Sequence, residues 1–489
     1  MGETSLAGRK KMLQKVASTG VDLDSVYGQT LQRIREQRGD RSRLGIEVLM
    51  WVSHAERPLK IEELRHALAV EMGATDLDPE NIRSQDTVLG SCLGLVIVDQ
   101  ETFIVRLIHY TLQEYLSRPG VLPDAHRVLA QSCLAYLNYD QVRGLQADIP
   151  PNLADMPFLE YSSFYWGMHA VIQLSDQART LALQLLNRYE THISATLVFH
   201  QITGIIFNPL SFPRFTGLHY ASYFGIDEVL AALIDMKDRD INQGDWDGFT
   251  PLILAITQGN QGAVRLLLSC EDVNPNKPAR RGQTPLYYAS RDGREDIVGL
   301  LLARGDVNPN GSDEYWETPL SRASCNGHEG VVRLILARND VNPDKPGTGG
   351  ITPLCSASCK GHEGIVRVLL ARNDVDPNHQ DKNSWTPLHG ASYQGHEGVV
   401  RLLLARDDVC PNHQDLEGWT PLSQASLLGY EGVVRLLLSR DDVDPDRADN
   451  CGRTPLALIA MGQLLGSSRD YKEIVRLLRL RTASSSSMN

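Results

Sequence analysis

The chain has 489 residues, 42% of them hydrophobic and 22% charged, so it holds enough apolar material for several packed domains. Its formal net charge of −12 disfavours binding to phosphate backbones or anionic membranes. No segment has the roughly 20 apolar residues that a membrane span needs, and the eight cysteines include no Cys-x-x-Cys pair, which predicts reduced thiols and a protein of the cytoplasm or nucleus.

The N-terminal part shows helix and strand patterns without a repeat. Residues 1–43 are predicted as a helical segment, and residues 44–120 as a domain with helices at 44–54, 60–72 and 86–93. The second helix is amphipathic, with Ile61, Leu64, Leu68 and Met72 on one face. Apolar runs at 95–98 and 103–107 predict a β-hairpin, and a further helix is expected at 109–116. Three helices followed by a two-stranded wing describe a winged-helix fold.

A winged helix could bind DNA or serve as a packing module. The helix before the wing, at 86–93, contains no Lys or Arg to contact phosphates or guanine edges. Acidic residues also outnumber basic ones over residues 1–200. The sequence therefore favours the packing module, followed by a helical linker region at 121–214, and predicts no nucleic-acid partner.

The C-terminal half repeats with a fixed period. Thr-Pro-Leu recurs at intervals of 34 residues with its Thr at 250, 284, 318, 352, 386, 420 and 454, and the variant Thr216-Gly217-Leu218 precedes it in phase. Thr is a favoured helix N-cap, Pro is tolerated at the first helical position, and a Gly nine residues later is expected in the left-handed conformation that ends the helix. A second helix follows, and Val-x-Pro stops it. Eight such units are predicted over residues 215–480, because a single unit cannot bury its own apolar face.

Some polar residues recur with the units. His328, His362 and His396 lie at one equivalent position, where a structural hydrogen bond at the start of the second helix is expected rather than a metal site. Cys355 and Cys359 are expected as buried or half-exposed thiols. The last unit carries an insertion at 463–470, and residues 481–489 are predicted as a disordered Ser-rich tail.

The unit beginning at Thr386, Thr-Pro-Leu-His-Gly-Ala, resembles the ankyrin signature, which implies a mostly α-helical solenoid with β-hairpin tips and a role in protein binding. Segments 51–59, 62–69 and 109–116 resemble the winged-helix region of fungal NACHT–ankyrin proteins, which is of the GPI inositol-deacylase type. That resemblance implies a sensor or adaptor of the NLR-like kind. The chain has no Gly-Lys dipeptide and therefore no phosphate-binding loop, so no nucleotide or other cofactor is expected.

The resemblance also implies where a partner binds. In ankyrin stacks the outward positions are those at −4, −3, −1, +7 and +8 relative to each Thr. In the last third of the stack these positions are apolar or aromatic, and a partner is expected to dock across the repeats of Thr386 and Thr420 with Trp385 and Trp419 as anchors. The alternative is that both rings pack on their own hairpins. The full set of candidate contact residues is Trp385, Tyr393, Trp419, Leu427, Leu428, Trp246, Phe249, Arg280, Arg281 and Arg291, and the three arginines are expected to face Glu314 and Glu317.

Catalysis is not expected. The sequence contains no Gly-x-Ser-x-Gly, His-Glu-x-x-His or Gly-x-Gly-x-x-Gly motif, and nothing selects a pair of carboxylates. Two functions remain: a protein-binding sensor or adaptor, and the truncated regulatory half of a NACHT nucleotide-driven switch that acts with an upstream or separate NTPase.

Overall fold

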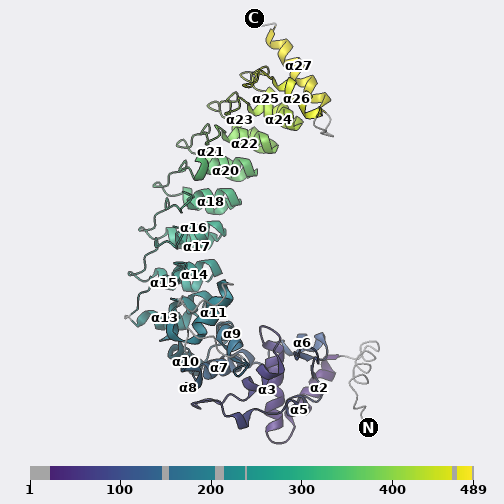
Figure 1. Ribbon diagram of the computed structural model, residues 1–489, viewed down its shortest axis with the longest axis vertical. Helices are drawn as coiled ribbons and strands as arrows, with labels where there is room; N and C mark the ends of the chain where they lie inside the picture. The colour runs from purple at the N-terminus through teal and green to yellow at the C-terminus, as the bar shows by residue number, and fades with distance from the viewer. Residues whose placement is uncertain (1–22, 146–153, 204–213, 237–238, 465–470, 487–489) are drawn as a thin grey trace. The chain divides into compact units, whose positions relative to one another are not determined.

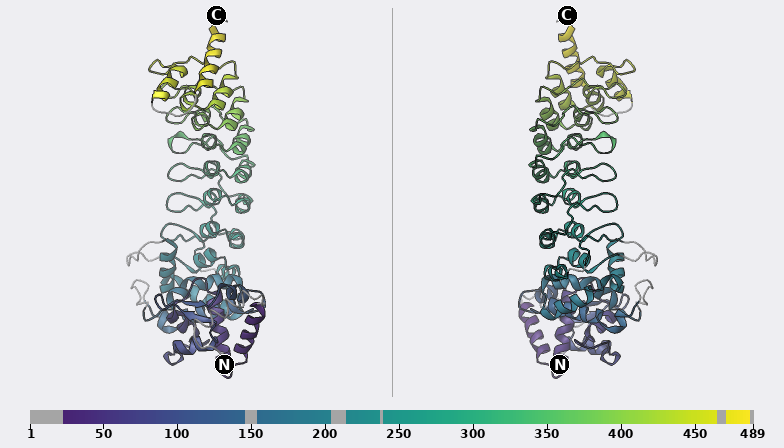
Figure 2. Two further views of the ribbon diagram at one scale, coloured as in Figure 1. Left: turned by 90° about the vertical axis from the view of Figure 1, so that its right-hand side faces the viewer. Right: turned by 90° about the vertical axis from the view of Figure 1, so that its left-hand side faces the viewer.

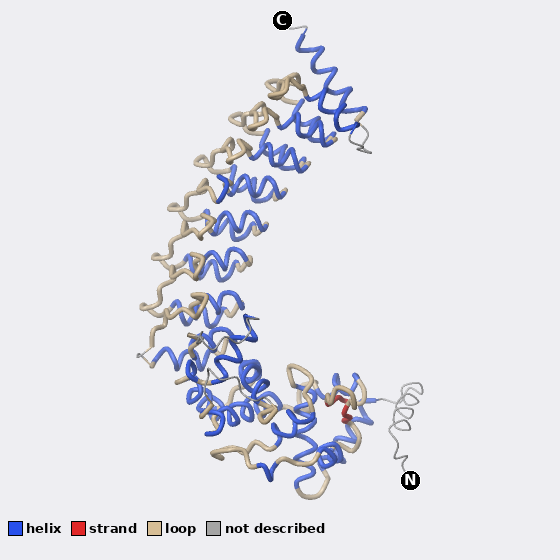
Figure 3. The backbone as a smooth tube through the Cα atoms, in the orientation of Figure 1, coloured by secondary structure: helices blue, strands red, loops and turns tan. Residues whose placement is uncertain are grey.

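The structure is a computed structural model that describes residues 23–145, 154–203, 214–236, 239–464 and 471–486. The chain divides into two compact units, Met1–Asp247 and Gly248–Asn489, called unit 1 and unit 2 below. The regular secondary structure of each is almost entirely helical, and the only strands among the described residues lie in unit 1 (Figure 3). No helix in the described part is long and apolar enough to cross a membrane.

Unit 1 begins with a winged-helix module. Its elements are α2 (Leu23–Arg35), α3 (Asp40–His54), α4 (Ile61–Leu68), η1 (Pro79–Asn81), α5 (Gln85–Ser91), β1 (Val96–Val98), β2 (Val105–Leu107) and α6 (Tyr110–Leu116). The strands are antiparallel, with Ile97 opposite Arg106, and Lys60 adds an isolated bridge to Ile104. The predicted order of three helices, hairpin and helix is therefore confirmed.

The predicted second helix of this module was too long at its C-terminal end. It ends at Leu68, where the Ala69 amide caps it by bonding to the carbonyls of Arg65 and His66. Ile61 and Leu64 lie in the core as predicted, but Met72 lies beyond the helix and is 41% exposed. The helical spacing of apolar residues continues in the sequence as far as Met72, but the helix itself ends one turn earlier, so Met72 is not placed on its buried face.

The remainder of unit 1 is helical and includes the first repeat. The elements are α7 (Ala125–Leu137), α8 (Asp140–Arg143), α9 (Leu159–Ile172), α10 (Asp176–Leu186), η2 (Tyr189–Thr191), α11 (Ile193–Thr203), α12 (Gly217–Phe224) and α13 (Asp227–Asp235). The rings of Trp166 on α9 and Tyr220 on α12 stack with centroids 4.7 Å apart, and the Gly167 amide donates to the Tyr220 hydroxyl. A side chain at Gly167 would meet Tyr220 and Phe224 at 2.9 Å, so glycine permits this close approach. The first repeat thus packs on α9, and the compact units divide one repeat later than the predicted boundary at 214/215.

Unit 2 is a stack of seven helix pairs, which Figure 2 shows as successive layers. The first helices are α14 (Pro251–Gln258), α16 (Pro285–Arg291), α18 (Pro319–Asn326), α20 (Pro353–Lys360), α22 (Pro387–Gln394), α24 (Pro421–Leu428) and α26 (Pro455–Leu464). The second helices are α15 (Gln261–Leu268), α17 (Glu295–Leu302), α19 (Glu329–Leu336), α21 (Glu363–Leu370), α23 (Glu397–Leu404), α25 (Glu431–Leu438) and α27 (Lys472–Ser486), and a short turn, η3 (Thr348–Gly350), lies between α19 and α20. The predicted insertion at 463–470 falls largely outside the described residues.

The predicted capping residues act as expected. The hydroxyl of Thr250 accepts the Ile253 amide, and the equivalent bond recurs at the start of the following first helices. Gly327 and its counterparts take the left-handed conformation that ends these helices. The histidines bind backbone as predicted: Nε2 of His362 donates to the Cys325 carbonyl one repeat back, at 3.1 Å. A Cβ on Gly327 would lie 2.8 Å from the His362 ring, so this glycine serves both the backbone and the contact between repeats.

A row of arginines ties each second helix to the previous one. Arg372 pairs with Asp374 at 2.6 Å and donates to the Leu336 carbonyl at the C-terminal end of the preceding second helix. A cation at a helix C-terminus is favourable because the last carbonyls have no partner within the helix. Equivalent bonds to the preceding repeat are made by Arg304, Arg338, Arg406 and Arg440.

The tail was predicted as disordered over residues 481–489, and the structure differs for residues 481–486, while 487–489 lie outside the described residues. Helix α27 continues to Ser486. Arg481 extends the arginine row, since it donates to the Arg440 carbonyl at 3.1 Å and pairs with Asp441 at 2.9 Å. This contact holds one more turn of helix against the stack. The serine-rich composition gave no sign of it, because the stabilising bond comes from another repeat.

A second row consists of asparagines in the loops that follow the second helices, and each bonds to the equivalent loop of the next repeat. Asn310 donates through Nδ2 to the Asp340 carbonyl and accepts the Asn342 amide at Oδ1. Asn276, Asn378 and Asn412 make the same pair of bonds. At the equivalent place the chain has Asp344, which accepts the Asp376 amide but leaves its buried Oδ1 without a partner among the described residues. Burial accordingly raises the pKa of the Asp344 carboxyl.

We predict that Asp344→Asn stabilises the protein by about 1 kcal/mol at pH 7, because the amide supplies the missing donor and removes a poorly solvated charge. Since the folded-state pKa is raised, the penalty exists above that pKa and disappears as the pH falls below the unfolded value near 3.9. Urea unfolding at pH 7 and pH 3.5 should therefore show a gain only at pH 7. Asp444→Asn, which removes an exposed carboxylate from the links, is the control and should change little. An unchanged midpoint for Asp344→Asn at pH 7 would contradict the argument.

Candidate protein-binding surface

The tips between the helix pairs of unit 2 have a shared architecture. In the tip before α22, the Asp381 amide bonds to the Trp385 carbonyl and the Ser384 amide bonds back to the Asp381 carbonyl, which gives a tight hairpin turn, and the same pair of bonds recurs in other tips. The described part of unit 2 contains no β-strand at the tips. The half-buried carboxylate of Asp381 accepts the amides of Asn383 and Trp385 and so fixes the turn. Asp313, Asp415 and Asp449 do the same in their repeats.

Successive tips are linked to one another by their backbones. The Thr348 amide donates to the Tyr315 carbonyl at 2.9 Å, the Lys382 amide to Gly349 at 2.8 Å, and the Leu416 amide to Asn383 at 3.3 Å. Figure 3 shows these loops on one side of the unit 2 helices. Side chains that project from neighbouring tips can therefore form one continuous surface.

The residue two places before each Thr has a left-handed backbone. Five tips of unit 2 place glycine there, at Gly248, Gly282, Gly350, Gly418 and Gly452, with φ between 76° and 82°. Ser384 takes φ 59°, and Trp316 takes φ 61°. A left-handed conformation costs an L-residue roughly 1–2 kcal/mol, and more suitable residues occupy the other repeats. Trp316 thus keeps a large ring at a position that disfavours it.

Trp316 is also the most exposed tryptophan among the described residues, at 65%. Its neighbour Tyr315 is 50% exposed, and Ile351 on the next tip is 39% exposed. Tyr315 and Ile351 occupy two of the predicted outward positions, −3 relative to Thr318 and −1 relative to Thr352, but the set of candidate contact residues did not name them. Trp316, at −2, lies outside the predicted positions. Aligning the tips would have revealed it, because Trp316 interrupts a column otherwise filled by small residues.

The predicted pair Trp385 and Tyr393 lies together in one repeat. Their ring centroids are 5.1 Å apart, and the Trp385 ring also stacks on His389 at 6.4 Å. Trp385 is half-buried, whereas Tyr393 is 41% exposed. Trp385 therefore packs partly on its own repeat, as the alternative interpretation held, and supports an exposed tyrosine.

The predicted residues of the next repeat are less accessible than expected. Trp419, Leu427 and Leu428 are half-buried, and the carbonyl of Trp419 accepts a bond from Nε2 of His389. The outermost apolar side chain of this tip is Leu416, at 60% exposure. The backbone of Trp419 therefore joins the two repeats, and Leu416 presents the more exposed apolar side chain.

The predicted arginines divide into two groups. Arg281 pairs with Glu314 of the next tip at 3.7 Å, as expected, and Arg280 is exposed beside it. Arg291 does not face the glutamates. Its guanidinium pairs with the adjacent Asp292 at 2.7 Å and lies over the Tyr288 ring, because the short acidic neighbour is closer than the next tip.

The two remaining candidates lie at the first tip in sequence order. Phe249 is half-buried, with its ring 5.4 Å from that of Tyr288 in the next repeat. Trp246 belongs to unit 1 and is 49% exposed. Most exposed apolar side chains of unit 2 thus follow four consecutive tips and first helices, whereas Leu334 and Leu480 lie on second helices. Together with the half-buried Trp385 that supports Tyr393, the former make up what we call the tip row: Tyr315, Trp316, Ile351, Trp385, Tyr393 and Leu416.

The fold and its outward apolar row define a helical repeat protein joined to a winged-helix module. A family model described as ankyrin repeats matches residues 195–279, 218–313, 270–346, 320–415 and 354–449, more than half of the chain, and the chain belongs to this family. A second model, the winged-helix domain of GPI inositol-deacylase, matches residues 34–125.

Two solved structures are similar to part of the chain. The human ASB11 ankyrin repeat domain is 26% identical, covers 46% of this chain and 98% of its own, and has a TM-score of 0.41. The ankyrin repeat domain of Bcl-3, described as a unique member of the IkappaB protein family, is 25% identical, covers 48% and 99%, and has a TM-score of 0.42. No curated protein matches the chain.

Proposed function

We propose that this protein is a non-catalytic sensor or adaptor of the cytoplasm or nucleus that binds a protein partner along the tip row. The observation that carries the proposal is Trp316, a 65% exposed ring held on a left-handed backbone where other repeats have glycine. Strain of this kind is retained where the surrounding structure or a function requires it. Folding gains little from an exposed ring, so recognition is the better explanation.

The chemistry of the row suits a protein partner. Aromatic side chains that are exposed but backed by neighbouring rings, such as Tyr393 on Trp385, bury much area at a low entropic cost. The charged pair Arg281 and Glu314 lies beside the aromatic tip and forms a polar rim. Nucleic acid and membrane are not proposed as partners, because α5 carries no basic residue and the chain is acidic.

The test is affinity purification from the source cells followed by mass spectrometry. We predict that a variant with Tyr315, Ile351, Tyr393 and Leu416 all replaced by alanine loses partners that the unmodified protein retains, with affinity reduced at least 100-fold. All four side chains are exposed, so the fold should persist and circular dichroism should be unchanged.

Leu334→Ala is the matched control. Leu334 is a similarly apolar side chain, 36% exposed, but it lies on the second helix α19 and not at a tip. Partners should be recovered with this variant as with the unmodified protein. Equal recovery with the four-residue variant would reject the tip row as the binding surface.

The domain pair supports a finer proposal. A winged-helix module of the GPI inositol-deacylase type beside ankyrin repeats resembles the layout of NACHT–ankyrin proteins, which suggests recognition or signalling of the NLR-like kind. The same pair supports a second function, the regulatory half of a nucleotide-driven switch that works with an upstream or separate NTPase. Sequencing transcripts upstream of the first codon distinguishes the two, since an in-frame phosphate-binding loop favours the second.

A further inference from the structure

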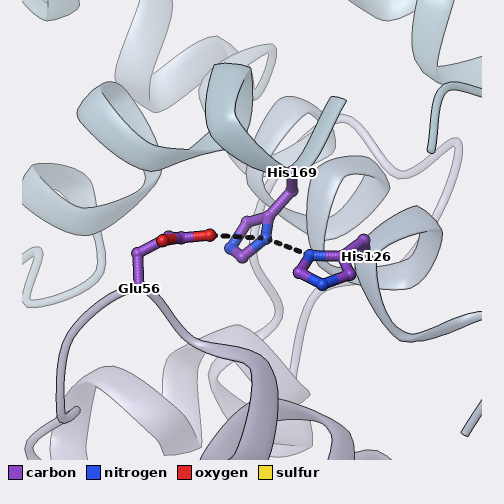
Figure 4. Close-up of side chains that lie close together, drawn as sticks. All are labelled: Glu56, His126 and His169. Atoms are coloured by element: carbon purple, nitrogen blue, oxygen red, sulfur yellow. Dashed lines mark hydrogen bonds and ion pairs between the residues drawn. The ribbon is translucent and has the colours of Figure 1, made fainter. Parts of the chain in front are cut away.

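Three side chains of the types that ligate metals converge in unit 1. Glu56 lies in the loop after α3, His126 in the first turn of α7, and His169 near the end of α9 (Figure 4). Nδ1 of His126 and Nδ1 of His169 are 2.9 Å apart, and Oε1 of Glu56 is 3.8 Å from Nδ1 of His169. All three donor atoms lie within 4.8 Å of one another.

We propose that Glu56, His126 and His169 form a binding site for a divalent transition metal, with Zn²⁺ as the best-suited ion. A tetrahedral site with bonds of 2.0–2.1 Å separates its donors by about 3.3 Å, which lies between the two distances observed here. Two imidazoles and one carboxylate with a fourth position for water are a donor set that zinc commonly accepts.

Hydrogen bonds with Tyr161 orient the proposed ligands. Nε2 of His169 lies 2.9 Å from the hydroxyl of Tyr161, so this nitrogen is engaged and Nδ1 points to the other donors. The same hydroxyl accepts the Glu56 amide, which fixes the loop that carries the carboxylate. Such second contacts orient metal-binding imidazoles in known sites.

The carboxylate is available and the site is accessible. Oε1 of Glu56 faces the ring of His169, whereas the adjacent Arg57 is engaged by Glu63 through two bonds. An open hollow of about 500 Å³ lies against His54 and His126 and gives an ion a route from solvent. The bound ion would join the loop after α3 in the winged-helix module to α7 and α9, and so stabilise the packing of the module on these two helices.

The experiment titrates the full-length, metal-stripped protein with ZnCl₂ by isothermal calorimetry and repeats the titration with Glu56→Gln and His126→Gln. We expect one Zn²⁺ per chain, a loss of affinity of at least 10-fold for Glu56→Gln and at least 100-fold for His126→Gln, and a rise in melting temperature with Zn²⁺ for the unmodified protein alone. Neither side chain is part of the buried core, and equal melting temperatures without metal show that the variants fold.

His66→Gln is the control for adventitious binding by histidine. His66 is half-buried on α4 and is not one of the three converging side chains, so this variant should bind Zn²⁺ as the unmodified protein does. Zinc binding that survives in both Glu56→Gln and His126→Gln would overturn the proposal. Absence of stoichiometric binding to the unmodified protein would also overturn it, and would show that the three side chains form a hydrogen-bonded cluster only.

Discussion

Trp316→Gly should make the protein more stable and its partner binding weaker. Glycine relieves a left-handed backbone that costs a tryptophan about 1–2 kcal/mol, while its own loss of freedom on folding costs about 0.5–1 kcal/mol. The net gain in the free energy of unfolding is about 0.5–1 kcal/mol, because a ring that is 65% exposed contributes little packing. Loss of an anchoring ring should cost on the order of 2 kcal/mol of binding, a roughly 30-fold weaker Kd.

Ser384→Gly separates the two effects. Ser384 occupies the equivalent position two tips later with nearly the same φ, 59° against 61°, so glycine there gives a similar relief of strain without removing an aromatic ring. Urea unfolding should show a gain for both variants, whereas binding to a partner identified by affinity purification should fall for Trp316→Gly alone. A loss of stability in Trp316→Gly would mean that the ring packs usefully, and unchanged binding would remove it from the proposed surface.

The repeat architecture was predictable because its signals are local and recur. The Thr, Pro and Gly of each unit act within one turn of helix, and the eight copies fix the register independently of any tertiary contact. The winged-helix order was predictable for a similar reason, since periodicity switches from helix to strand at 95–107. The ends of helices were less predictable: the helix expected to reach Met72 ends at Leu68.

What the sequence did not reveal depends on contacts between distant residues. Arg481 holds the last helical turn through a carbonyl of Arg440, and composition alone suggested disorder there. Arg291 turned to its neighbour Asp292 and not to the next tip. The convergence of Glu56, His126 and His169 arises from the packing of α7 on α9, and their spacing along the chain matches no metal motif.

Buried neutral histidines should make the fold sensitive to acid. In His389, Nδ1 accepts the Thr386 amide and Nε2 donates to the Trp419 carbonyl, so both ring nitrogens are already engaged in the neutral form. Protonation of Nδ1 would place its new proton against the N–H of Thr386, so the bond between them would be lost. Burial is the main cause that lowers the pKa of His389 to about 4 from its ordinary 6.5. His192 in unit 1 is held in the same way by Leu137 and Ser194, and burial lowers its pKa to about 4 as well.

A base whose folded-state pKa is lowered stabilises the fold above its unfolded pKa, and that contribution is lost as the pH falls toward the folded value. Each of these two histidines should therefore cost up to about 3 kcal/mol between pH 6.5 and pH 4, at 1.36 kcal/mol per pKa unit. Hydrogen exchange at pH 7 and pH 4.5, corrected for the intrinsic exchange rates, should show a loss of protection in α11 and in α22.

His389→Ser isolates the effect in unit 2, because the protein itself uses serine at this position. Ser321 and Ser423 each accept the amide of their capping Thr and thus replace the ring's bond at the helix start. The variant should be less stable at pH 7, since serine does not reach the carbonyl of the next tip, but α22 should lose less protection at pH 4.5 than in the unmodified protein. The response of α11 should not change, because His192 remains. If α22 opens in acid to the same extent with serine, then the acid sensitivity of this repeat has its origin in its carboxylates and not in His389.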